Sequence, residues 1–213
     1  AWTPALDAKA DVQWAEEVLS AGGNADSPWN KPRSYTAFSL SNGLRVLLVE
    51  DDATDQMEMA FTLPFGQFDD LKDLPGLAHL TEHLLLSGPG PSDALQLETW
   101  LEPRSGQSNG FTGFESALFT LSCGVEDWSD ALRRFGHCFR RTDMADTDSR
   151  FRAEAVDREV LRINGEFQDG LSAGLRSLQL LRYRTVEDHP LRSFGPGSLK
   201  TLLPRGNGKQ ELE

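Results

Sequence analysis

Cysteine is scarce in this chain, which has only Cys123 and Cys138 among its 213 residues. Two cysteines cannot form a disulfide scaffold, and their spacing does not match a metal-binding knuckle. We therefore interpret both as buried free thiols, which favours a reducing compartment. We expect the cytoplasm, with a mitochondrial or other organellar location as the alternative.

The chain also has few positively charged residues and no long apolar run. Lys and Arg together number 21 against 33 Asp and Glu, which gives a formal net charge of −12. This sign is wrong for binding a phosphate backbone or an anionic membrane surface. No apolar stretch approaches the roughly 18 residues that would cross a bilayer. We therefore expect neither nucleic acid nor a membrane as a partner.

Hydrophobic residues make up 38% of the chain, enough to bury a sizeable core. Residues 1–34 contain one short amphipathic candidate helix, residues 12–21, followed by a Gly- and Pro-punctuated stretch that is typical of a linker. We predict that residues 1–34 are an N-terminal extension and that residues 35–213 form the domain.

The domain begins with a predicted hairpin, because Asn42-Gly43 separates two runs rich in strand-forming residues. A helix is expected where Pro75-Gly76 opens an apolar segment and Gly88 closes it. The predicted strands cover residues 35–40, 44–50, 57–63 and 117–123, the predicted helices cover 77–86, 93–101, 126–139 and 149–181, and 105–112 is a turn or short strand. Hairpins without regular β-α alternation favour an α+β fold, a mostly antiparallel sheet with helices packed on one face.

The predicted helix at 77–86 carries His79, Glu82 and His83 in the pattern H-x-x-E-H. Two histidines four positions apart share one helix face and can bind one metal ion. Two imidazoles leave room for a third protein ligand and a water, as in catalytic zinc sites, and Glu82 could take a proton from that water. The alternative is a chance pattern of ordinary core or surface histidines.

A third ligand must come from elsewhere in the chain. Glu159 and Glu166 are seven positions apart and so lie on one face of the predicted helix at 149–181. One of them could bind zinc while the other orients a ligand. A solvent-exposed helix face explains the same spacing equally well, so position alone does not decide between these interpretations.

Five stretches resemble the N-terminal domain of the pitrilysin/insulysin family of zinc metallopeptidases, and within it the insulysin and nardilysin branch. They are SLSNGLRVLLVED, DLPGLAHLTEHLLLSG, SGQSNGFTGFES, DREVLRINGEFQ and HPLRSFGPGSLKTL, which begin at positions 39, 73, 105, 157 and 189. They occur in the family's order and extend over residues 35–204, almost the whole chain.

The resemblance implies a zinc-dependent metalloendopeptidase with one Zn²⁺ per chain. His79, His83 and Glu166 would be the zinc ligands, Glu82 the general base and Glu159 the residue that orients a ligand. An edge strand would pair with an extended peptide or small unfolded polypeptide substrate. Its residues are Ser108, Asn109, Gly110, Phe111 and Thr112.

Two departures from the family pattern affect these expectations. The connector at 142–155 is longer than usual and lacks its proline; if it shifts the helix register, Glu154 is the nearest substitute for Glu166. Family members are also several times longer, with four related domains in two halves. The resemblance therefore implies that the remaining domains act in cis, or that a separate chain completes a half-enzyme in trans. The alternative function is a noncatalytic domain that serves as an assembly or interaction module.

Overall fold

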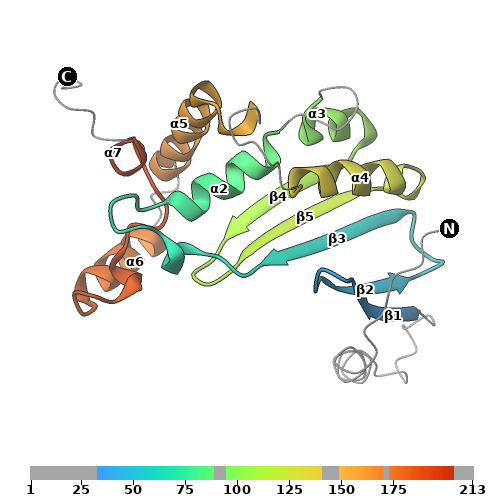
Figure 1. Cartoon of the computed structure of the whole chain (residues 1–213), viewed down its shortest axis with the longest axis horizontal. Coiled ribbons are helices and arrows are strands. Elements are labelled where there is room, and N and C mark those ends of the chain that lie inside the picture. The colour runs from blue at the N-terminus through green and yellow to red at the C-terminus, as the bar shows by residue number, and fades with distance from the viewer. Residues whose placement is uncertain (1–32, 89–94, 141–148, 170–172, 204–213) are drawn as a thin grey trace. The chain divides into compact units, whose positions relative to one another are not determined.

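A computed structural model describes residues 33–88, 95–140, 149–169 and 173–203 (Figure 1). The chain divides into two compact units, residues 1–55 and 56–213. The predicted helix at 12–21 lies outside the described residues.

The first unit contains an antiparallel hairpin of β1 (Ser34–Ser39) and β2 (Arg45–Glu50). Its turn is closed by a hydrogen bond from the Leu40 amide to the Leu44 carbonyl (2.8 Å), and Asn42 Oδ1 accepts from the Leu44 amide (3.1 Å). Gly43 has a φ of 84°, a conformation that glycine adopts without steric cost. The Asn-Gly prediction of a hairpin is confirmed.

The second unit is built on a three-stranded antiparallel sheet in the order β3-β5-β4. The strands are β3 (Gln56–Leu63), β4 (Gln107–Thr112) and β5 (Ala117–Gly124). Strand β4 pairs with β5 so that Gly110 lies opposite Phe119. Within the described residues β4 is at the sheet edge, with one side unpaired by any strand.

The helices agree with the predicted segments except near the C-terminal end. They are α2 (Leu77–Leu86), α3 (Leu97–Leu101), α4 (Trp128–Cys138), α5 (Ala153–Asp169), α6 (Ala173–Arg184) and α7 (Leu199–Leu202). The prediction of one helix over 149–181 is wrong, because α5 and α6 are separate helices (Figure 1). This part of the sequence contains Gly170 and Gly174, and glycine disfavours a continuous helix. Helix α3 is shorter than the predicted helix at 93–101, because in the described residues it begins only at Leu97.

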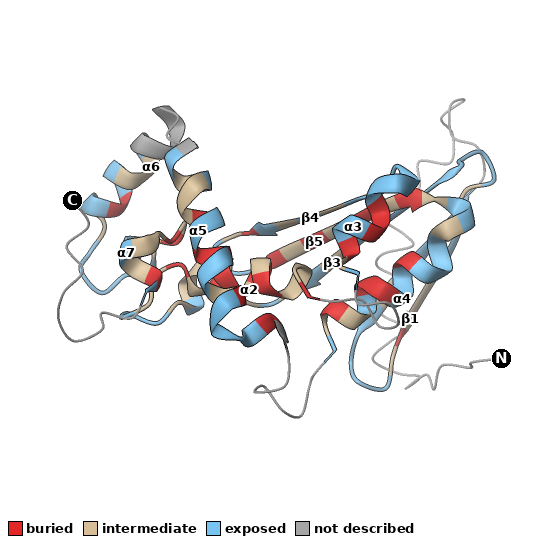
Figure 2. Ribbon diagram, turned by 90° about the horizontal axis from the view of Figure 1, so that it is seen from above, coloured by how far each residue is buried: buried red, intermediate tan, exposed pale blue. Residues whose placement is uncertain are grey.

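Helices α3 and α4 cover one face of this sheet (Figure 2). Alternate residues of β5, including Phe119 and Leu121, are buried under Trp100 and Leu101 of α3 and Phe135 of α4. Each such side chain contributes about 1.5–3 kcal/mol by leaving water. The expected α+β fold, with an antiparallel sheet and helices on one face, is confirmed.

A second core joins α2 to α5 and α7. Its buried residues are Leu80 and Leu84 of α2, Val160 and Ile163 of α5 and Leu202 of α7. Because Leu80 and Leu84 share α2 with the two histidines, and Val160 and Ile163 share α5 with the two predicted glutamates, this core fixes the helices that carry the candidate site against each other.

No helix in the described part of the chain is long and apolar enough to cross a membrane.

Candidate active site

The site is organised around α2, whose first turn is held by a carboxylate from the preceding loop. Asp70 accepts hydrogen bonds from the backbone amides of Gly76 (2.7 Å) and Ala78 (2.8 Å). These amides have no partner within the helix, so a carboxylate there stabilises its start. Burial raises the pKa of Asp70, and the two hydrogen bonds partly oppose that rise.

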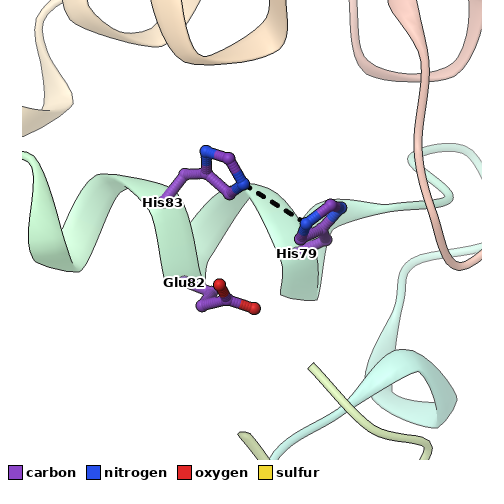
Figure 3. A group of neighbouring side chains, drawn as sticks. All are labelled: His79, Glu82 and His83. Carbon is purple, nitrogen blue, oxygen red and sulfur yellow. Dashed lines mark hydrogen bonds between the residues drawn. The ribbon is translucent and has the colours of Figure 1, made fainter. Parts of the chain in front are cut away.

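His79, Glu82 and His83 project from α2 as one group (Figure 3), with the two Nε2 atoms 3.3 Å apart and the ligand atoms of all three residues within 4.8 Å of one another. The Nδ1 atom of His79 is 2.7 Å from the Pro196 carbonyl oxygen. The Nδ1 atom of His83 is 3.4 Å from the Glu159 carboxylate. Because a carbonyl and a carboxylate oxygen only accept, Nδ1 is the donor in both contacts, and in the neutral tautomer each Nε2 then presents a lone pair.

Glu166 completes a triangle with the two imidazoles. Its Oε2 atom is 3.5 Å from His79 Nε2 and 3.5 Å from His83 Nε2. Three electron-pair donors that converge in this way repel one another unless a positive charge lies between them. Ligand atoms arranged tetrahedrally at zinc are about 3.3–3.4 Å apart, given bond lengths of about 2.0–2.1 Å. The donor set and its spacing therefore fit a zinc ion.

Glu82 is buried, and its carboxylate lies against β4 with an oxygen within 4.8 Å of the histidine nitrogens. The Thr112 hydroxyl donates to Glu82 Oε2 at 2.5 Å. Gly110 leaves the space that the carboxylate occupies, because a Cβ at position 110 would collide with Glu82 Oε1. Strand β4 therefore both confines and orients the Glu82 side chain.

Glu159 lies beneath His83 with only 1% of its side chain exposed. Besides His83, it faces Arg162 Nη1 at 3.4 Å and Arg158 Nε at 3.8 Å. A buried carboxylate is tolerated when it is paired in this way. The structure thus gives Glu159 the geometry of a residue that orients the His83 ring through Nδ1.

These groups open onto a cleft of about 520 Å³. All ten predicted site residues line it: His79, Glu82, His83, Ser108, Asn109, Gly110, Phe111, Thr112, Glu159 and Glu166. A second cavity of about 1170 Å³ shares five lining residues with the first: Gln96, Glu98, Ser108, Asn109 and Arg162. The exposed edge of β4 therefore runs beside the donor triangle, in a space large enough for an extended chain.

The sequence did not reveal several residues that support this site. Gln67, Arg162 and Pro196 line the cleft, and Asp70 stabilises the start of α2. Only Asp70 carried a recognisable signal, as an acidic residue shortly before a helix start. Gln67 and Pro196 reach the site through contacts between distant segments, which no local pattern encodes, whereas Arg162 is three positions from Glu159 on α5.

The chain is similar to known proteins over most of its length. Residues 45–187 match the family model described as "Insulinase (Peptidase family M16)". The A-factor-processing enzyme of Saccharomyces cerevisiae is 31% identical over 83% of this chain and 17% of its own length. The insulin-degrading enzyme of Homo sapiens is 31% identical over 85% of this chain and 17% of its own length.

Among solved structures, the crystal structure of pitrilysin superposes with a TM-score of 0.73 and 26% identity, over 82% of this chain and 18% of that one. The chain spans about a fifth of the length of these relatives. The family model covers well over half of the chain, and the fold agrees with it. The chain therefore belongs to the insulinase family of peptidases, M16, as a peptidase-like domain.

Proposed function

We propose that this domain is the catalytic part of an insulysin-type zinc metalloendopeptidase, and that it hydrolyses peptides and small unfolded polypeptides. The observation that carries the proposal is the triangle of His79, His83 and Glu166 donor atoms, with edges of 3.3, 3.5 and 3.5 Å. These three residues would hold one zinc ion. When bound, that ion would polarise the scissile carbonyl and lower the pKa of a bound water.

Glu82 would be the general base. It accepts a proton from the attacking water as the new carbon–oxygen bond forms, and it returns that proton to the amine nitrogen as the carbon–nitrogen bond breaks. The 2.5 Å hydrogen bond from Thr112 and the space at Gly110 support this role, since they hold the carboxylate at one position beside β4. Glu159 would orient His83.

Residues Ser108–Thr112 of β4 would bind the substrate backbone. An unpaired strand edge offers main-chain donors and acceptors that do not depend on side-chain identity, which suits an enzyme for varied peptides. Because this edge lies in the same cleft as the donor triangle, a peptide paired to it would pass the histidines in extended form.

The proposed catalytic domain comprises residues 35–213, preceded by an extension at 1–34. Since the chain spans about a fifth of its relatives, we propose that further domains, in the same chain or in a partner chain, complete the substrate chamber. A cytoplasmic location is proposed from the two buried free cysteines.

Metal analysis tests the proposal without needing a substrate. The purified chain should bind one equivalent of zinc, and His83→Ala should lose it. His137→Ala is a matched control, because His137 is on α4 and outside the cleft. A correctly folded chain that binds no zinc would contradict the proposal and favour a noncatalytic interaction module of the same fold.

A further inference from the structure

The stretch at 189–202 is the last of the five that carry the family resemblance. In the structure it returns to the start of α2. The Pro196 carbonyl accepts the hydrogen bond from His79 Nδ1 at 2.7 Å. A Cβ at Gly76 would collide with the Gly197 backbone and one at Gly197 with the Leu202 side chain, and both glycines have positive φ angles (96° and 76°). This loop therefore determines which nitrogen of His79 faces the proposed metal.

Arg182 of α6 holds that loop. Its side chain is buried, at 3% exposure, and Nη1 donates to the Ser193 carbonyl at 2.5 Å. Nη2 donates to Gln67 Oε1 at 2.6 Å. Burial lowers the pKa of Arg182, with Asp70 partly opposing the change. Its Nε finds no hydrogen-bond partner among the residues that the structure describes. A buried cation with an unsatisfied donor is costly, so its retention calls for an explanation.

Gln67 connects Arg182 to strand β4. Its Nε2 donates to the Thr112 carbonyl at 3.2 Å, at the end of β4. Its side chain also lies directly against Gly195, in the loop that carries Pro196. Thr112 is the residue whose hydroxyl holds Glu82. One hydrogen-bonded pair, Gln67 and Arg182, thus contacts both the loop that orients His79 and the strand that orients Glu82.

We infer that Gln67 and Arg182 are positioning residues for the proposed active site. Arg182 does not line the cleft and acts through the loop on His79, while Gln67 acts through Thr112 on Glu82. The inference rests on the proposed function for its catalytic meaning. A purely structural role, in which Arg182 only attaches α6 to the domain, would change stability but leave the histidine geometry unchanged.

The test compares Arg182→Met with Arg184→Met, which removes an exposed arginine from the same helix. Both variants lose one positive charge, but only Arg182→Met loses the contacts to Ser193 and Gln67. In the folded Arg182→Met chain we expect zinc affinity to fall about 10-fold or more, the loss typical when the group that orients a metal ligand is removed. Arg184→Met should match the wild type.

A second readout uses the metal-free chain. The His79 Nδ1 proton, detected by ¹⁵N-edited NMR, should exchange with water faster in Arg182→Met than in wild type or Arg184→Met. Unchanged exchange together with unchanged zinc affinity would overturn the inference. If the wild type itself binds no zinc, the proposed function fails, whereas the exchange measurement still decides whether Arg182 positions His79.

Arg182→Lys covers the case in which Arg182→Met does not fold. A single ammonium cannot reproduce the fork that bonds to two acceptors, so this variant should fold and show an intermediate loss of zinc affinity. Gln67→Leu tests the contact from Gln67 to Thr112 separately. This variant should lower kcat in the complete protein more than it lowers zinc affinity. Wild-type zinc affinity in Arg182→Lys and wild-type kcat in Gln67→Leu would overturn the inference.

Discussion

Thr112 and Glu82 are joined by a 2.5 Å hydrogen bond, although they are 30 positions apart in the sequence. Thr112 ends β4 and Glu82 lies in the middle of α2, so the bond ties the proposed base to the proposed substrate-binding strand. Both residues are buried, which makes the hydrogen bond stronger than it would be in water. In the proposed mechanism, the chemistry and the alignment of the substrate would therefore depend on the same contact.

Thr112→Val should lower kcat with little change in KM or zinc content, because it removes the hydroxyl but keeps the side-chain shape. A hydrogen bond to a charged group is worth about 1.5–3 kcal/mol, so we expect a decrease of roughly 10- to 100-fold in kcat. Thr112→Ser keeps the hydroxyl and should retain most of the wild-type kcat. Steady-state cleavage of a fluorogenic peptide by the complete protein measures kcat and KM for both variants. Equal kcat values for Val and Ser would contradict a positioning role for the hydroxyl.

The third ligand can be tested by comparing two glutamates on α5. Glu166→Gln should weaken zinc binding by more than about 100-fold, because a ligand is lost rather than a group that orients one. Glu154→Gln is the matched control, since Glu154 is exposed in the first turn of the same helix. Competition with a chromogenic chelator gives both affinities. A larger loss in Glu154→Gln would show that the connector shifts the register after all.

Asp70→Ala should destabilise the fold by about 1–2 kcal/mol, because it removes the carboxylate that accepts from Gly76 and Ala78 at the start of α2. Asp73→Ala is the control, since Asp73 is exposed in the same loop. Urea unfolding followed by circular dichroism measures the difference. Equal free energies of unfolding for the two variants would show that the cap contributes nothing.

The two cysteines should react slowly with thiol reagents at pH 8. Both are buried, and burial raises the pKa of each thiol above the ordinary value of 9.0. A raised folded-state pKa means that the folded chain disfavours the thiolate. The protonated thiols therefore contribute to stability below the pKa of the unfolded chain, and this contribution is lost as the pH rises through the pKa of the folded chain. Alkylation followed by mass spectrometry in buffer and in urea tests this. Equal rates in both conditions would refute burial.

Local sequence signals predicted the elements whose boundaries are marked by turn and breaker residues. Pro75-Gly76 and Gly88 placed α2 at the residues observed, and Asn42-Gly43 placed the first hairpin. Strand β4 was ambiguous because Gln-Ser-Asn-Gly shows no alternation of apolar and polar residues. The prediction of one helix over 149–181 was wrong, because α5 ends at Asp169 and α6 begins at Ala173.

The motif predicted which residues meet, but not what holds them in place. Histidines four apart on a helix face the same way by geometry alone, so His79 and His83 could be paired from sequence. The contacts of Pro196 with His79 and of Thr112 with Glu82 span 117 and 30 positions. Such contacts depend on how the helices, strands and loops pack, which residue spacing does not specify.

Glu82→Gln in the complete protein tests the proposed chemistry most directly. Glutamine is nearly the same size and can still accept a hydrogen bond from Thr112, but it cannot take a proton from water. Zinc content should stay at one equivalent while kcat for peptide cleavage falls by about 10²- to 10⁴-fold. Cleavage at the wild-type rate by a zinc-loaded Glu82→Gln variant would contradict Glu82 as the general base.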